Sequence, residues 1–103
     1  MIYDDFVSAI GGTNLIELTF ASSSKGIITR ICAPMDFGPW KRSSSGEIRY
    51  HFIDLNSSAG EHPLSIKADR ILKLTVLNQK FKPENIVHWV PEWHIARDWG
   101  IYS

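Results

Sequence analysis

The chain has 103 residues, which is enough for one domain with a single hydrophobic core and too few for two. Apolar residues make up 44% of the sequence and aromatic residues 12%, and this composition excludes an intrinsically disordered chain. Eleven basic and eleven acidic side chains cancel, so no overall positive field attracts nucleic acid, although a local basic patch is compatible with this balance. We therefore expect one folded domain over residues 1–103.

Cysteine usage and hydropathy indicate the cellular setting. The only cysteine, Cys32, has no partner for an intramolecular disulfide. The sequence shows no basic-then-apolar leader and no apolar run of about 18 residues. A cytoplasmic protein that does not enter a membrane is expected.

Residues 2–11 have the spacing of a short amphipathic helix. Phe6, Ala9 and Ile10 recur at helical intervals, and two aspartates precede them near the positive end of the helix. A pair of glycines follows and favours a helix stop. The sequence predicts an N-terminal helix over residues 2–11.

Residues 14–81 have the pattern of consecutive strands joined by turns. In the clearest strand, Ile48, Tyr50 and Phe52 fall on one face, while Glu47, Arg49 and His51 fall on the other. Consecutive strands with short turns favour an antiparallel meander, and strongly bent strands of this kind close into a small barrel. The predicted fold is mainly β (β+α): a small antiparallel SH3/Sm-like barrel with a short N-terminal helix and one or two short C-terminal helices.

The same alternation predicts which side chains fill the barrel and where the longest loop lies. Residues 36–46 are expected to form that loop, because they are rich in glycine, proline and serine. Ile53 and Leu55 are out of phase with Phe52, which indicates a bulge or a strand buried on both faces. The predicted core consists of Ile16, Leu18, Ile28, Ile31, Ile48, Tyr50, Phe52, Leu64, Ile66, Leu72, Leu74 and Val76.

Residues 82–103 differ from the strands in composition and contain three of the four tryptophans. Pro83 and Pro91 each stand where a first helical turn tolerates proline, which predicts short helices over 83–89 and 91–99. These helices are expected to pack on the barrel and plug its open end.

The tryptophans of this tail are assigned two roles. We predict that Trp89 and Trp93 are largely buried, because a helix this short needs tertiary packing. Arg97, Trp99 and Tyr102 are predicted to stay partly exposed as a partner interface, since these residue types concentrate at binding hot spots.

Residues 28–81 resemble the WYL domain, an SH3/Sm-like β-barrel found in bacterial regulators. Pro34 follows the strand IITRICA, Tyr50 lies mid-strand where the family carries its name motif, and IKADRI at 66–71 is similar to the closing strand of the family. This chain reads Arg49-Tyr50-His51 at the name motif and keeps only the tyrosine. The resemblance implies a ligand-sensing or nucleic-acid-sensing module with Tyr50 and Arg70 near the site.

A mixed, mildly basic surface is predicted beside the central strands. Alternation places Arg49, His51, Lys67 and Asp69 on the outward face, and the longest loop carries an aromatic residue and two cations that overhang it. Such a surface suits an anionic or aromatic ligand through hydrogen bonds and stacking. For the loop tryptophan, a rim residue folded back on the barrel is the alternative. The predicted ligand-binding residues are Trp40, Lys41, Arg42, Arg49, Tyr50, His51, Lys67 and Arg70.

Catalytic and metal chemistry find little support in the sequence. The four histidines match no compact metal-binding spacing, and surface or capping roles are expected for them. Cys32 lies in an apolar strand, where a free cysteine behaves as a small hydrophobe. No acid, base and nucleophile fall at recognisable spacing, so we predict no catalytic residue, no metal and no cofactor.

The favoured function is a small non-enzymatic binding module for a small anionic ligand or single-stranded nucleic acid. The alternative is an adaptor, complex subunit or homodimer that docks through its tryptophan-rich C-terminal segment. The fold does not choose between them.

Overall fold

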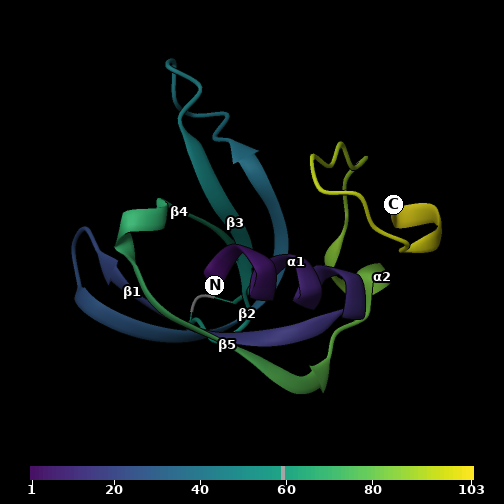
Figure 1. Ribbon diagram of the computed structural model, residues 1–103, viewed down its shortest axis with the longest axis horizontal. Helices are drawn as coiled ribbons and strands as arrows, with labels where there is room; N and C mark the ends of the chain where they lie inside the picture. The colour runs from purple at the N-terminus through teal and green to yellow at the C-terminus, as the bar shows by residue number, and fades with distance from the viewer. Residues whose placement is uncertain (59) are drawn as a thin grey trace.

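The computed structural model describes residues 1–58 and 60–103 and contains a five-stranded antiparallel sheet preceded by a helix (Figure 1). The strand order is β4-β3-β2-β1-β5. The mainly β class with short helices is confirmed, but β4 and β5 end the order unpaired with each other, so the sheet does not close into the predicted barrel. The elements are α1 (Ile2–Gly12), β1 (Asn14–Ser22), β2 (Gly26–Pro39), β3 (Ile48–Asp54), β4 (His62–Ile66) and β5 (Ile71–Lys80).

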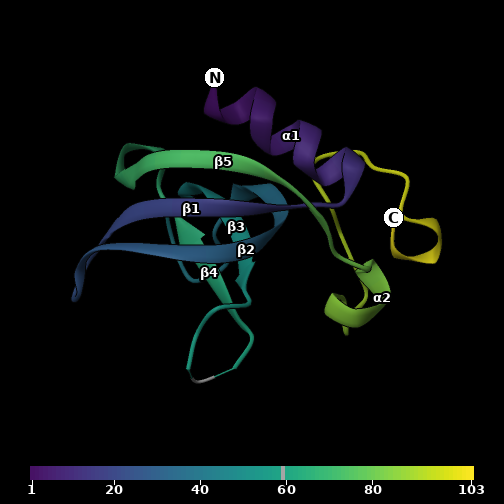
Figure 2. The ribbon, with the colours of Figure 1, turned by 90° about the horizontal axis from the view of Figure 1, so that it is seen from below.

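Helix α1 forms where the sequence predicts it and covers one face of the sheet. Figure 2 shows it running above β5. Its apolar stripe, Phe6, Ala9 and Ile10, is buried, and Thr13 ends the helix in the left-handed conformation at φ 52°. The Phe6 ring meets Tyr50 and Phe52 edge-on at centroid distances of 4.9 and 5.4 Å. The helix therefore seals the apolar face of β3.

Strand β3 keeps the predicted alternation from Arg49 onwards, whereas Ile48 at its start is exposed. Tyr50, Phe52 and Asp54 are buried on one face, where Tyr50 and Phe52 pack against α1, and the intervening side chains are half-buried on the opposite face. The predicted bulge belongs to β2 instead, where Pro34 pairs with Phe52 and Asp36 pairs with His51, which leaves Met35 as the extra residue. A bulge re-aims the side chains beyond it. Residues 32–36 of β2 are consecutively buried, so both faces of the strand are covered here.

Three of the predicted core positions are wrong. Ile48, Leu72 and Val76 are 49%, 53% and 36% exposed. Two of them lie on β5, which has β1 on one side only, and a register shift between Thr19 and Phe20 places Ile71 in the core instead. Among the others, Ile16, Leu18, Tyr50 and Phe52 are buried, and Ile28, Leu64, Ile66 and Leu74 pack partly buried against them. Ile31 is half-buried on β2 and lies outside this core cluster.

The long loop is shorter than predicted. Residues 36–39 continue β2 and pair with β3, because the bulge restores the register beyond Met35. The loop proper covers residues 40–47 and is closed by a hydrogen bond from the Trp40 N–H to the Glu47 carbonyl at 2.8 Å. In the predicted turn 56–60, Ala59 lies outside the described residues.

The C-terminal part is mostly not helical, contrary to the prediction. Helix α2 covers Pro83–Ile86, with Pro83 in its first turn, and residues 91–99 contain no helix; a 3-10 turn, η2 (Gly100–Tyr102), follows. A further 3-10 turn, η1 (Ala68–Arg70), joins β4 to β5. We call residues 87–103 the C-terminal strap. No helix in residues 1–58 and 60–103 is long and apolar enough to cross a membrane.

Candidate ligand-binding groove

A groove of about 580 Å³ is lined by the end of β2, by β3 and β4, by the start of the 40–47 loop and by the C-terminal strap. Ile53, Leu64 and Ile66 contribute apolar surface to it. Its volume falls within the range of small-molecule sites, which is roughly 300–1,000 Å³. The half-burial of Ile53, which alternation alone places on a solvent face, follows from this cover.

Aromatic rings line the groove from two separate segments. Trp40 enters from the loop, and Trp89 and Trp93 enter from the strap, where their ring centroids lie 6.1 Å apart in an edge-on contact. The Arg49 guanidinium covers one face of Trp40 at 3.8 Å from the ring centroid. Such stacking orients both groups and places a positive charge beside the indole, where a ligand in the groove could contact both.

A charged cluster holds Arg49 in that position. Glu47 accepts hydrogen bonds from Arg49 Nε at 3.0 Å and Nη2 at 2.8 Å, and Lys67 lies 2.9 Å from the same carboxylate. Hydrogen bonds from Lys67 and then Arg49 lower the pKa of Glu47. Arg49 Nη1 also donates to the Ser65 main-chain oxygen at 2.8 Å. Two cations and one carboxylate leave a positive excess at this end of the groove.

His51 and Ser65 form a hydrogen-bonded pair on the face of the groove. His51 Nδ1 lies 2.8 Å from Ser65 Oγ, and Nε2 lies 2.9 Å from the Gly38 carbonyl oxygen. A carbonyl only accepts, so Nε2 carries the proton in the neutral ring and Nδ1 accepts the Ser65 hydroxyl proton. Sequence reasoning missed Ser65; pairing β3 with β4 about the 56–60 turn would have placed it opposite His51, as the register does.

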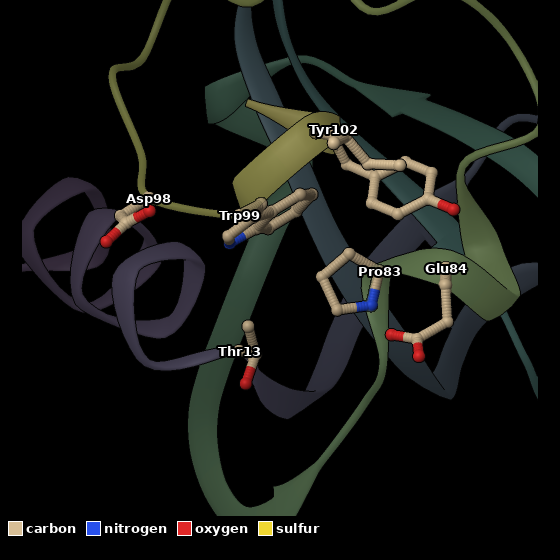
Figure 3. Close-up of a pocket in the computed structure, with 7 residues that line it drawn as sticks. Thr13, Pro83, Glu84, Asp98, Trp99 and Tyr102 are labelled. Atoms are coloured by element: carbon tan, nitrogen blue, oxygen red, sulfur yellow. The ribbon is translucent and has the colours of Figure 1, made fainter.

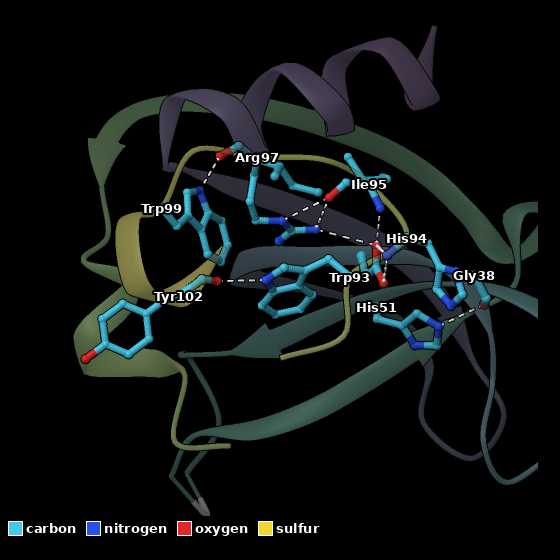
Figure 4. Close-up of polar contacts among 10 residues, drawn as sticks. Gly38, His51, Trp93, His94, Ile95, Arg97, Trp99 and Tyr102 are labelled. Carbon is cyan, nitrogen blue, oxygen red and sulfur yellow. Dashed lines mark hydrogen bonds and ion pairs between the residues drawn. The ribbon is translucent and has the colours of Figure 1, made fainter. Parts of the chain in front are cut away.

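The strap is attached to the sheet through Asp36. The buried Asp36 carboxylate accepts the backbone N–H groups of His94 at 2.9 Å and of Ile95 at 3.0 Å (Figure 4). Because these donors are satisfied by a side chain 58 and 59 residues away, they are not needed for helical bonds. These contacts explain why residues 91–99 are not helical although their spacing predicts a helix.

Arg97 completes the attachment with a fully buried side chain. Its Nη2 lies 3.5 Å from Asp36, and its guanidinium lies 3.9 Å from the Trp93 ring centroid and 4.5 Å from that of Trp99. Burial lowers the pKa of Arg97 to about 10, and the Asp36 charge opposes that shift. Nη1 is buried without a hydrogen-bond partner in the described part of the chain.

The predicted exposure of the tail tryptophans is reversed. Trp99 is 5% exposed and donates from Nε1 to the Ile10 carbonyl at 2.9 Å, whereas Trp89 is 46% exposed and Trp93 is half-buried. In the predicted interface, Arg97 and Trp99 are therefore interior side chains. The prediction failed because it assumed a helical face, while the extended strap turns Trp99 towards the end of α1.

A second hollow, of about 470 Å³, lies where α1, α2 and η2 meet (Figure 3). Tyr102, the third predicted interface residue, lines it half-buried, and Trp99 forms part of its wall. Glu84 and Asp98 give it acidic side chains. It is separate from the groove, since the two share no lining residue.

The predicted ligand-binding residues divide into a group at the groove and a group away from it. Trp40, Lys41, Arg42 and His51 line the groove, and Arg49 adjoins it through Trp40 and Ser65. Lys67 is linked to Arg49 through their shared partner Glu47.

Two of the predicted residues lie elsewhere. Tyr50 points into the core at 5% exposure, where burial raises its pKa, and Arg70 donates to the Ala21 carbonyl at 2.9 Å near the end of β1. Their distance from the groove follows from the alternation of β3 and from the 3-10 turn that carries Arg70.

Cys32 is buried and free, and burial followed by the nearby Asp54 charge raises its pKa to about 12. Asp54 itself is held by Arg30 at 3.4 Å and by the Asn56 N–H at 2.8 Å. The described residues contain no group of three or more His, Cys, Asp or Glu arranged for a metal ion.

Comparison of the chain with protein-family models, with curated proteins and with solved structures gives no match.

Proposed function

We propose that this chain is a small binding module whose groove takes an anionic ligand that carries a planar ring. The observation that supports this most is the Trp40 indole, covered on one face by Arg49 and followed by Lys41 and Arg42, at an apolar groove of about 580 Å³. An aromatic ring beside cations suits stacking with a planar group while the charges attract its anionic part.

The SH3/Sm-like fold and the WYL-like character are part of this proposal. An N-terminal helix and an antiparallel meander with a 3-10 turn before β5 support them. Tyr50 is buried and does not line the groove, so a ligand here would meet Arg49 and His51 rather than the tyrosine that carries the resemblance. A bacterial, cytoplasmic protein without enzymatic activity stays a prediction from the sequence.

Thermal-shift and tryptophan-fluorescence titrations with adenosine monophosphate, adenosine and inorganic phosphate test the proposal. We expect the monophosphate to bind, with the neutral nucleoside and the free phosphate each binding more weakly, because the groove offers both a ring and charge. A short oligothymidylate in the same panel shows whether single-stranded nucleic acid binds the same surface.

The variant Trp40→Ala should weaken monophosphate binding by about five- to a hundredfold, since base stacking on an aromatic residue contributes about 1–3 kcal/mol. Its unliganded melting temperature should stay close to that of the wild type. Tyr3→Ala, which removes a 45% exposed ring on α1 instead, is the matched control and should bind normally. Equal affinity of Trp40→Ala and wild type, or no binding by any probe, contradicts the proposal.

A second candidate function is protein docking through the strap. Trp89, Val90 and Ile101 are 46%, 87% and 88% exposed, and apolar side chains this exposed favour association. The homodimer form of this candidate is tested by light scattering across a hundredfold concentration range. A Val90→Asp, Ile101→Asp variant should then be monomeric, and a wild type that is monomeric throughout rules the homodimer out.

A further inference from the structure

We propose that Ser65 and His51 form a nucleophile and general-base pair that gives the groove acyl-transfer activity towards activated esters. This goes beyond reversible binding and departs from the sequence expectation that the protein is not an enzyme. It rests on a juxtaposition that no spacing in the sequence displays, because the two residues come from neighbouring strands.

The geometry has the three members that nucleophilic catalysis requires. The hydroxyl of Ser65 lies 2.8 Å from His51 Nδ1, within the range for direct proton transfer, and the Gly38 carbonyl holds the other ring nitrogen at 2.9 Å (Figure 4 shows this second contact). The carbonyl fixes both the tautomer and the ring orientation, which is the part that a third residue plays in serine hydrolases. Both side chains line the groove.

The position of Gly38 allows this arrangement. A Cβ at residue 38 would come within 3.0 Å of two atoms of the His94 ring, so a larger residue would displace either the strap or the strand that presents the carbonyl. Asp36 pairs with His51 in the register of β2 and β3 and also lines the groove.

Arg49 supplies the positive charge for the developing oxyanion. It makes three hydrogen bonds within the described residues, two to Glu47 and one to the Ser65 main-chain oxygen, and a guanidinium has five N–H groups. One unused N–H belongs to Nη1, the nitrogen that donates to the Ser65 main-chain oxygen, so a further donor lies beside the serine and the contact with Ser65 keeps the group in place. Charge that is already positioned is what stabilises a tetrahedral intermediate.

The chemistry balances without a further reagent. Ser65 Oγ forms a bond to the acyl carbon while its proton moves to His51 Nδ1, and the ester C–O bond breaks as Nδ1 returns that proton to the leaving oxygen. Water then attacks the acyl-serine, gives a proton to Nδ1, and the serine oxygen recovers it as the acid departs. No electrons are exchanged with a cofactor.

The test uses a fluorophosphonate probe and p-nitrophenyl acetate with the full chain. We expect one phosphonylated residue, Ser65, identified by peptide mass spectrometry, and an initial burst of nitrophenol. Ser65→Ala should abolish both, and His51→Gln should slow labelling by about a hundredfold, in line with general-base catalysis. Ser45→Ala is the matched control, because Ser45 is an exposed serine whose hydroxyl contacts only another serine among the contacts described for it.

Each outcome decides between this inference and the binding proposal. Labelling that is confined to Ser65 and depends on His51 supports the nucleophile and general-base pair. This holds even if Ser65→Ala fails to fold, because mass spectrometry identifies the labelled residue in the wild-type protein. No labelling of the wild type, labelling at other residues, or normal labelling of a folded His51→Gln variant overturns it. Monophosphate binding with no labelling leaves the binding proposal standing and removes only this one.

Discussion

The layer between α1 and the sheet and the layer under the C-terminal strap are both buried, but different forces hold them. On the α1 side, Phe6, Ile16 and Phe52 are at most 1% exposed and make apolar contacts that require no particular direction. On the strap side, one carboxylate, Asp36, receives two backbone N–H groups and a buried guanidinium. We therefore expect the α1 side to supply most of the stability and the Asp36 contacts to position the wall of the groove.

The largest effect is expected on the α1 side. Phe52→Ala should lower the free energy of unfolding by about 3–5 kcal/mol, because it removes a ring that contacts Phe6 and leaves a cavity. Urea denaturation followed by circular dichroism measures this. Ile53→Ala, the neighbouring half-buried residue on the groove face, should cost less, and equal losses would contradict the assignment of the main core to the α1 side.

Asp36→Ala should destabilise the strap without destabilising the layer between α1 and the sheet to the same extent. Removing one partner of a buried ion pair costs about 3–5 kcal/mol, and here two backbone donors also lose their acceptor. Because the lost contacts attach only the strap, we expect a loss of stability at the lower end of that range. The strap should also detach from the sheet under conditions in which the sheet is still folded. Hydrogen exchange should show the His94 and Ile95 amides deprotected while the β1 and β2 amides stay protected. Unchanged protection of those two amides would contradict the conclusion that Asp36 holds the strap on the sheet.

Arg97→Met tests whether the ion pair or the backbone hydrogen bonds to Asp36 hold the strap on the sheet. Methionine can fill the space between Trp93 and Trp99, and it removes a guanidinium whose burial lowers its pKa. Asp36 loses its buried countercharge but keeps its two backbone partners, so we expect a loss smaller than that of Asp36→Ala, in which the backbone bonds are lost as well. A loss as large as that of Asp36→Ala would show that the charge pair, rather than the backbone bonds, holds the strap.

The smallest effect concerns Cys32 and alkaline pH. The pKa of the Cys32 thiol is raised from the ordinary 9.0 to about 12 in the folded protein. The contribution of this thiol to the free energy of unfolding is therefore complete below pH 9 and is lost as the pH rises from 9 towards 12. Between pH 8 and pH 10 the wild type should lose on the order of 1 kcal/mol through this group. Cys32→Ala should lack this part of the dependence in urea titrations at the two pH values. Parallel curves for both proteins would show that the thiol ionises normally.

Local patterns were sufficient for α1 and β3. The apolar spacing of Phe6, Ala9 and Ile10 and the alternation through Tyr50 and Phe52 depend on neighbours in sequence, and both predictions hold. The β5 positions Leu72 and Val76 failed because burial there depends on whether a further strand covers the edge. Dependence on distant residues also limited the prediction of the groove. Loop composition and strand alternation predicted Trp40, Arg49 and His51 as ligand-binding residues, but they did not predict Ser65, whose position beside His51 depends on the pairing of β3 with β4.

Local patterns in the sequence were enough to predict the class of the fold, the N-terminal helix and the charged outward face of β3, because propensity and periodicity act over a few residues. The conformation of residues 91–99 and the burial of Trp99 depend on the folded chain, since Asp36 satisfies backbone donors from the far end of the chain. The pairing of His51 with Ser65 likewise depends on the folded chain, because it exists only once β3 and β4 are in register. Interactions between distant residues overrode helical spacing there because a buried backbone N–H must find an acceptor wherever the fold supplies one.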